Sequence, residues 1–213
     1  MHTNFWLNRW KNNEISFHEE EANPLLVKFF PDLSLRKGSR VFLPLCGKTR
    51  DIAWLLAQGY LVVGAELSQL AIEQLFAELH AEPEITQQGA LRHYRAENLD
   101  IFVGDLFQLA GSILESVDAI YDRAALVALP QETRKRYTTH IMTITESAPQ
   151  LLITYEYDQS QMDGPPFSIS QKEIDQHYAQ HYEITHLSHT EATGPLRKRV
   201  VAQEAVWLLN SLN

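Results

Sequence analysis

Cysteine is nearly absent from this sequence: Cys46 is the single one among 213 residues, so no disulfide can form within the chain. Such cysteine usage fits a reducing compartment, and we expect a cytoplasmic protein. Long apolar runs are missing as well, and the N-terminus MHTNFWLNRWKNNE lacks the apolar core of a signal peptide. We therefore expect neither membrane insertion nor export.

Positive charge is also scarce. Lys and Arg number 18 against 27 Asp and Glu, which gives a formal net charge of -9. Because affinity for nucleic acid comes largely from Lys and Arg that neutralise phosphates, this balance disfavours a nucleic-acid partner and favours a small molecule. Repeats, low-complexity tracts and Gly/Ser-rich linkers are absent too, so we expect a single domain over residues 1–213.

The chain does contain a regular alternation of strand and helix patterns. The run SRVFLP at 39–44 predicts a strand, and the apolar spacing from 52 to 56 predicts the helix that follows it. Residues 60–66 predict the next strand, with Ser68 as the cap of a second helix. Further strands are predicted at 99–103, 117–121 and 151–155. This order is typical of an α/β fold with a mostly parallel sheet flanked by helices, which binds ligands at the carboxyl ends of its strands.

The pattern changes after the fifth strand. A turn-rich loop at 158–167 precedes Ser170 and Glu173, whose spacing predicts the start of another helix. Residues 182–187 and 200–208 then predict a closing pair of strands.

The turn after the first strand, PLCGK at 44–48, has only one glycine. A dinucleotide fingerprint requires GxGxxG and a phosphate loop requires GxxxxGKS or GxxxxGKT, so hydride transfer and nucleotide-triphosphate chemistry are disfavoured. S-adenosylmethionine carries no phosphate and does not need such a cradle. Glu66 ends the second strand about twenty residues later, the spacing at which an acid accepts hydrogen bonds from ribose hydroxyls. The alternative is an acid favoured there by the helix dipole.

Two further strand ends carry polar residues. In GDLF, Asp105 could accept a hydrogen bond from an adenine amine and Leu106 could pack on the ring, although Asp105 could equally cap a helix. In YDRAALVALP, we expect Asp122 and Arg123 at the rim of the same cleft. An Asp-Arg pair is more often structural than catalytic, but this position faces the bound ligand if Glu66 binds the ribose.

Three runs in matching order resemble the signature runs of the thiopurine S-methyltransferase family: FLPLCGKTRDIAWLLAQGYLVVGAELS, YDRAALVAL and GPPF. The segment WLNRWKNNEISFHEE is similar to the opening of that family. The resemblance covers most of the chain and points to a bacterial-type member. It implies a Class I S-adenosylmethionine-dependent methyltransferase with a Rossmann-like sheet and a C-terminal antiparallel edge hairpin. Residues 1–38 would then form a helical flap over the cofactor site.

The resemblance also implies site residues. Trp10 would be a wall of the cofactor site, Leu45 a backbone contact to the amino-acid part of the cofactor, and Glu66 the ribose ligand. Arg123 would lie where the cofactor meets the substrate. An aromatic face attracts a sulfonium, although Trp10 could instead be a hydrophobic staple on the core. The family has a further arginine before the last strand, and two residues are candidates for it: Arg197 and Arg199.

The implied activity is methyl transfer from S-adenosylmethionine to small aromatic or heterocyclic thiols such as thiopurines, and also to selenium and tellurium compounds. Arg123 would favour the anionic form of the acceptor, with Asp122 as a second choice for a base. The alternatives are a halide or bisulfide methyltransferase and a protein that binds S-adenosylmethionine without catalysis. We expect a monomer and no metal site, since His177 and His181 have helical spacing but no third ligand nearby.

Overall fold

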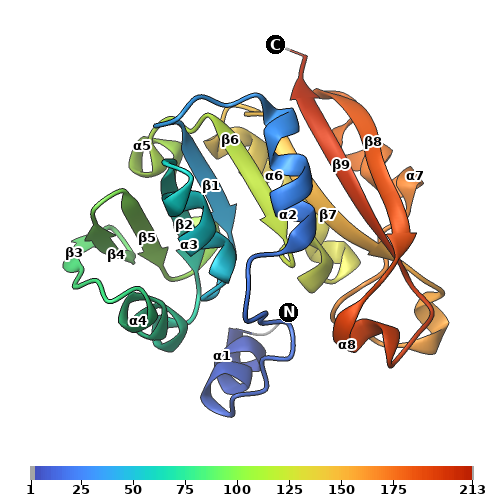
Figure 1. Cartoon of the computed structure of the whole chain (residues 1–213), viewed down its shortest axis with the longest axis horizontal. Coiled ribbons are helices and arrows are strands. Elements are labelled where there is room, and N and C mark those ends of the chain that lie inside the picture. Colours follow the sequence, from blue (N-terminus) through green and yellow to red (C-terminus); the bar gives the residue numbers. More distant parts are fainter. Residues whose placement is uncertain (1–2, 213) are drawn as a thin grey trace.

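The computed structural model describes residues 3–212 and arranges them around a nine-stranded sheet of order β3-β4-β5-β2-β1-β6-β7-β9-β8 (Figure 1). The expected domain of 1–213 also includes residues 1, 2 and 213, which lie outside the described residues. The strands are β1 (Arg40–Pro44), β2 (Leu61–Glu66), β3 (Glu84–Gln88), β4 (Leu91–Ala96), β5 (Leu99–Val103), β6 (Ala119–Arg123), β7 (Gln150–Glu156), β8 (Tyr182–Glu191) and β9 (Gln203–Ser211).

Five neighbouring strands, β5-β2-β1-β6-β7, run parallel to one another. Val62 and Val63 are consecutive in β2, so their side chains point to opposite faces of the sheet, yet both are buried. Burial on both faces explains why these strands read as continuous apolar runs in the sequence. The predicted α/β fold with a mostly parallel sheet is confirmed.

Helices cover both faces of the sheet. Tyr137 and Ile174 are buried on one face, and Leu26 and Ile52 are buried on the other. The α-helices are α1 (Thr3–Lys11), α2 (Pro24–Phe29), α3 (Arg50–Ala57), α4 (Gln69–Glu78), α5 (Gly111–Leu114), α6 (Gln131–Ile144), α7 (Gln171–Tyr178) and α8 (Gly194–Arg197). Short 3₁₀ helices are η1 (Phe30–Leu33), η2 (Leu106–Gln108), η3 (Leu126–Ala128) and η4 (Gln159–Gln161). Within residues 3–212, no helix combines the length and the apolar character that crossing a membrane requires.

Two predicted helix starts are confirmed by their capping bonds. The Ser68 hydroxyl accepts a hydrogen bond from the Ala71 amide at 3.3 Å, at the start of α4. The Ser170 hydroxyl accepts one from the Glu173 amide at 3.3 Å, at the start of α7. Each bond satisfies an amide that has no partner within its own helix.

The C-terminal part adds antiparallel strands to one edge of the sheet, as expected. β9 lies between β7 and β8 and is antiparallel to both. The boundaries differ from the prediction: the strand expected at 200–208 is Gln203–Ser211, and β8 extends to Glu191. The short helix α8 lies between the two strands, and Val200 packs in a small cluster beneath it. Apolar residues of this connection therefore resembled the start of a strand.

The opposite edge of the sheet holds a hairpin, β3 and β4, that the sequence did not predict. All five residues of β3 are exposed. A strand with no buried face has no alternation of apolar and polar residues, so periodicity gives no signal for it.

The N-terminal segment divides into two parts. In Figure 1, α1 lies below the carboxyl ends of the central strands and does not pack on either face of the sheet. α2 and η1 instead lie against the sheet, and Leu26, Phe30 and Leu33 are buried in its core. The part of the expected flap of 1–38 that stands over the strand ends is therefore the part before α2.

Candidate active site

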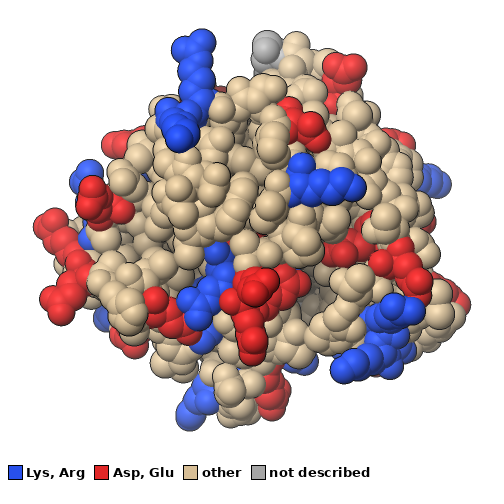
Figure 2. All heavy atoms as spheres, in the orientation of Figure 1, with Lys and Arg blue, Asp and Glu red and all other residues tan. Residues whose placement is uncertain are grey.

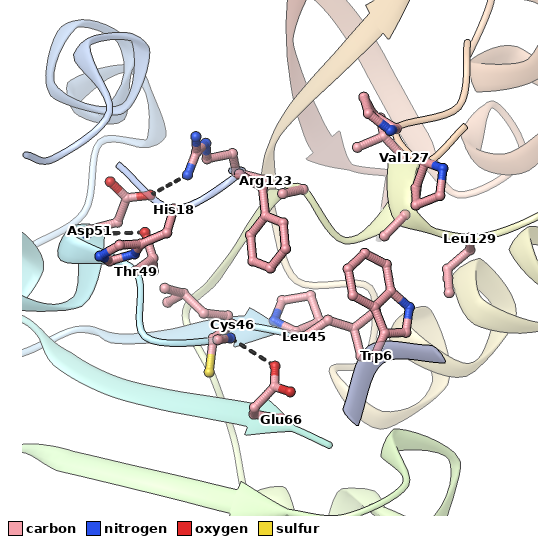
Figure 3. Close-up of a pocket in the computed structure, with 18 of the residues that line it drawn as sticks. Trp6, His18, Leu45, Cys46, Thr49, Asp51, Glu66, Arg123, Val127 and Leu129 are labelled. Carbon is pink, nitrogen blue, oxygen red and sulfur yellow. Dashed lines mark hydrogen bonds and ion pairs between the residues drawn. The ribbon is translucent and has the colours of Figure 1, made fainter. Parts of the chain in front are cut away.

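A cavity of about 520 Å³ opens at the carboxyl ends of β1, β2 and β6. Ligand pockets in proteins commonly measure about 300–1,000 Å³. Figure 3 shows the side chains of Trp6, Glu66 and Arg123 arranged around this space. The wall includes four groups of residues: the N-terminal segment (Trp6, Trp10, Phe17, His18, Glu19), the strand ends (Leu45, Gly47, Glu66, Asp105, Leu106, Arg123), the stretch at η3 (Val127, Leu129) and a C-terminal wall (Tyr155, Pro165, Pro166, Leu196, Arg199, Glu204). Residues of α3 and α6, among them Asp51 and Tyr137, also line the cavity.

Glu66 is fixed at the end of β2 by two backbone amides. Its Oε2 accepts a hydrogen bond from the Gly47 amide at 2.8 Å, and its Oε1 accepts one from the Ser68 amide at 2.8 Å. The residue is only 6% exposed. Burial raises the pKa of this carboxyl, and the backbone amides lower it in part. A carboxylate oxygen can accept more than one hydrogen bond, so both oxygens keep capacity for a ligand in the cavity.

The turn between β1 and α3 brings backbone close to Glu66. Leu45 and Gly47 have positive φ angles of 49° and 54°, so the chain doubles back at this point. Leu45 also lines the cavity. An adenosine group requires an acceptor for its ribose hydroxyls and apolar surface for its ring, and Glu66 with this turn and Leu106 fits that requirement.

Trp10 packs on the same turn. The residue is 5% exposed, and a Cβ added to Gly47 would lie 2.9 Å from the Trp10 ring atom Cζ2. The Phe17 ring meets the Trp10 ring edge to face, with centroids 5.6 Å apart. Trp10 also lines the cavity. Trp10 is therefore buried like a core residue and also forms part of the cavity wall.

Asp105 and Leu106 also line the cavity, at the end of β5. Asp105 is exposed and caps η2, because its Oδ1 accepts a hydrogen bond from the Phe107 amide at 3.0 Å. Leu106 is buried, and its carbonyl accepts a hydrogen bond from His140 at 2.9 Å. Asp105 therefore caps η2 and also lines the cavity.

Asp122 does not occupy the rim position expected from the sequence. It is fully buried and accepts hydrogen bonds from the Tyr137 hydroxyl at 2.6 Å and the Leu126 amide at 3.1 Å. The residues that line the cavity do not include it. Neighbours in a strand point to opposite faces, so Asp122 faces α6 while Arg123 faces the cavity. This placement does not fit the suggested role as a base.

Arg123 reaches into the cavity wall and meets two carboxylates. Its Nη2 lies 2.6 Å from Glu19 Oε1, and its Nη1 lies 3.9 Å from Asp51 Oδ2. The side chain is 10% exposed. Burial alone would lower the pKa of the guanidinium. The charges of Tyr121, Asp51 and Glu19 raise that pKa by more than burial lowers it, so the group stays charged.

Glu19 belongs to an acidic stretch of the chain. Figure 2 shows acidic side chains on the segment that joins α1 to α2, where the sequence has Glu19, Glu20 and Glu21. Elsewhere on this face of the molecule, basic and acidic side chains are interspersed. The residues that line the cavity have both signs of charge, among them Glu19, Lys48 and Arg123.

The C-terminal wall was largely missed by sequence reasoning. Pro165 and Pro166 belong to the GPPF run that carried the family resemblance, but Glu204 and Tyr155 gave no signal. Of the two candidate arginines, Arg199 lines the cavity. Arg197 is instead paired with Glu191, with Nε 3.4 Å from Oε1, on the exposed surface. Among the described residues, no group of three or more His, Cys, Asp and Glu is placed to hold a metal ion.

Comparison with known sequences gives a match over almost the whole chain. The profile of the family described as thiopurine S-methyltransferase (TPMT) matches residues 1–211. A thiopurine S-methyltransferase of Xanthobacter autotrophicus is 50% identical over 210 residues, which cover 98% of this chain and 99% of the relative. One of Gluconobacter oxydans is 42% identical over 208 residues, covering 98% of this chain and 94% of the relative.

Solved structures agree on the fold. The Burkholderia thailandensis 1,6-didemethyltoxoflavin-N1-methyltransferase, solved with S-adenosylhomocysteine, superposes with a TM-score of 0.68 at 15% identity and covers 98% of this chain and 87% of its own. A methyltransferase of Anabaena variabilis that depends on S-adenosylmethionine gives 0.65 at 14% identity, covering 98% of this chain and 94% of its own. The predicted Class I fold and cofactor are thereby confirmed, and this chain belongs to the thiopurine S-methyltransferase family of S-adenosylmethionine-dependent methyltransferases.

Proposed function

We propose that this protein methylates the sulfur of small aromatic or heterocyclic thiols of the thiopurine type. Selenium and tellurium compounds are further candidate acceptors. The names of the relatives support this substrate class. The observation that carries the proposal is Arg123, a charged guanidinium that is 10% exposed and lines the same cavity as Glu66 and the C-terminal wall.

The cofactor site in this proposal is the part of the cavity at the strand ends. Glu66 binds the ribose hydroxyls, Leu45 contacts the amino-acid part through its backbone, and Trp10 faces the sulfonium. Leu106 and Asp105 contact the adenine. The bound S-adenosylmethionine supplies a methyl group on a positively charged sulfur, which is already an activated leaving group.

The protein groups align and desolvate the acceptor. Arg123 favours the thiolate form of the acceptor, because a nearby positive charge stabilises the anion. The α1 segment, with Trp10 buried over the turn, excludes water from the reacting atoms. The acceptor sulfur forms a bond to the methyl carbon as the bond from that carbon to the sulfonium breaks. A thiol that ionises near neutral pH needs no strong base, which suits the absence of Asp122 from the cavity wall.

The C-terminal wall is the proposed acceptor site. Pro165, Pro166 and Leu196 offer apolar surface for an aromatic ring, and Arg199 offers a second positive charge. A halide or bisulfide would require a smaller and less aromatic site. We also propose that the protein acts as a cytoplasmic monomer without a nucleic-acid partner, in keeping with its single cysteine and its net charge of -9.

The test is a transfer assay with radiolabelled methyl groups on S-adenosylmethionine. The acceptors are a panel of aromatic and heterocyclic thiols, selenite, tellurite, bisulfide and halides. Transfer to the thiols supports the proposal. Transfer to halide or bisulfide alone would replace the proposed acceptor class, and binding of S-adenosylmethionine without transfer to any acceptor would indicate a non-catalytic binding protein.

A further inference from the structure

The C-terminal wall contains a buried carboxylate, Glu204, that the proposed mechanism has not used. The residue is 7% exposed and lines the cavity at the start of β9. A buried carboxylate is costly unless it accepts hydrogen bonds or meets a positive charge. Because Glu204 lines the cavity, a bound ligand could supply such a hydrogen bond or positive charge.

The sheet places Glu204 beside two other cavity residues. It is directly opposite Tyr155 in the antiparallel pair of β7 and β9, so the two side chains share a face. Arg123 of the neighbouring strand β6 is on that face too, because it pairs with Ile153, two residues before Tyr155 in β7. All three line the cavity.

Glu204 shares the positive charge of Arg123 with other groups and has no ion-pair partner of its own among the described residues. Arg123 is already engaged by Glu19 at 2.6 Å and lies 3.9 Å from Asp51. Burial raises the pKa of the Glu204 carboxyl, while the neighbouring Tyr155 hydroxyl and the charge of Arg123 lower it and the charge of Glu19 raises it. The carboxylate therefore remains able to accept a hydrogen bond, and then a proton, from a molecule in the cavity.

Heterocyclic thiols supply such a proton. Their neutral form is commonly the thione, in which the hydrogen is on a ring nitrogen next to the carbon that bears sulfur. When the thione sulfur takes a methyl group, the product is a cation until the ring N–H proton leaves. A carboxylate that accepts a hydrogen bond from this N–H increases the electron density on sulfur and can then take the proton.

We propose that Glu204, oriented by the Tyr155 hydroxyl, binds the ring N–H of a heterocyclic thione and receives its proton during methyl transfer. This rests on the proposed function of the same site. The new bond joins the acceptor sulfur to the methyl carbon, and the bond from that carbon to the sulfonium sulfur breaks. The ring proton passes to the Glu204 carboxylate and from there to solvent. The site thereby prefers thiones with an adjacent N–H to thiols that lack one.

The experiment compares two probes, mercaptopurine, which has the ring N–H, and thiophenol, which has none. Steady-state constants are measured for the wild type, Glu204→Gln and Tyr155→Phe. Glu204→Gln should lower kcat/KM for mercaptopurine by on the order of 10²-fold and leave thiophenol nearly unaffected. Tyr155→Phe should give the same selective loss to a smaller extent. The loss should shrink at a pH where mercaptopurine has already lost its proton.

The control variant is Glu191→Gln, which removes an exposed carboxylate on β8 that pairs with Arg197. It should leave both probes unchanged. An equal loss for both probes in Glu204→Gln, or an unchanged constant for mercaptopurine, would overturn the role of Glu204. If Glu204→Gln does not fold, the same comparison of mercaptopurine with thiophenol is made for Tyr155→Phe. A wild type that methylates neither probe would instead overturn the proposed function itself.

Discussion

Single side chains at the cavity wall are held by backbone and charge contacts that leave some of their polar atoms for a ligand. Glu66 is the clearest case, because each of its oxygens already accepts one amide. Glu66→Ala should therefore weaken binding of S-adenosylmethionine by about 1–3 kcal/mol, the usual cost of leaving buried hydroxyls without a charged acceptor. Calorimetric titration checks this. Unchanged affinity in a folded variant would remove Glu66 from the cofactor site.

Arg123 allows catalysis and binding to be separated. Arg123→Lys keeps the charge but loses the planar guanidinium, and Arg123→Ala loses both. If Arg123 stabilises the thiolate, both variants lose turnover, and the loss is smaller for acceptors that are fully ionised at the assay pH. If Arg123 only anchors the cofactor, turnover falls equally for all acceptors and the KM for S-adenosylmethionine rises. Wild-type kinetics for thiols of high and low acidity would contradict both roles.

Residue positions were predictable where a strand end fixes them and less so where side-chain direction matters. Glu66, Leu45 and Arg123 line the cavity as expected. Asp122 was expected at the cavity rim beside Arg123, but consecutive residues of a strand face opposite sides, and Asp122 instead accepts a hydrogen bond from the Tyr137 hydroxyl. Glu204 gave no signal because its role depends on a strand pairing between distant segments.

At the scale of elements, α1 and the turn after β1 act together, because Trp10 fills the space over Gly47. Gly47→Ala places a Cβ 2.9 Å from the Trp10 ring, so it should displace α1 and lower cofactor affinity. Gly38→Ala is the matched control: its φ of +83° is also positive, but nothing lies within 4 Å of the added Cβ. Each substitution should lower stability by roughly 1–2 kcal/mol through its backbone conformation.

The measurements are cofactor affinity by calorimetry and stability by denaturant titration. Only Gly47→Ala should lose affinity beyond what its stability loss explains. Equal affinities for the two variants would mean that Trp10 is not coupled to the cofactor site.

Elements with a buried face were predictable, and elements without one were not. The five parallel strands carry apolar runs that the sequence displays. β3 is exposed along its length, so its strand character comes from pairing with β4 alone. The short helix α8 begins at Gly194 and Pro195 and is too brief to show a helical period.

At the scale of the whole molecule, the buried Asp122 couples folding to pH. Burial raises its pKa from 3.8 to about 6, although the Tyr137 hydroxyl and two backbone amides act against the shift. Because the folded-state pKa is the higher one, the folded protein binds the proton more tightly. The stabilisation that this group contributes to the folded state is therefore greatest below about pH 4, and it is lost as the pH rises through about 6.

Asp122→Asn should remove this pH dependence. The difference of about two pKa units corresponds to about 3 kcal/mol. Denaturant titrations at about pH 4 and about pH 7 measure how much the free energy of unfolding falls over that range. The wild type should fall by about 3 kcal/mol more than the variant. Parallel pH profiles for the two proteins would contradict a raised pKa at Asp122.

We propose that this molecule carries a methyl group from S-adenosylmethionine to the sulfur of a heterocyclic thiol. The most direct test of this claim is to incubate the purified protein with mercaptopurine and S-adenosylmethionine that bears an isotope-labelled methyl group, and to locate the label by NMR and mass spectrometry. We predict label on sulfur, with S-adenosylhomocysteine formed in equal amount. Label on a ring nitrogen, or bound cofactor with no transfer, would contradict the claim.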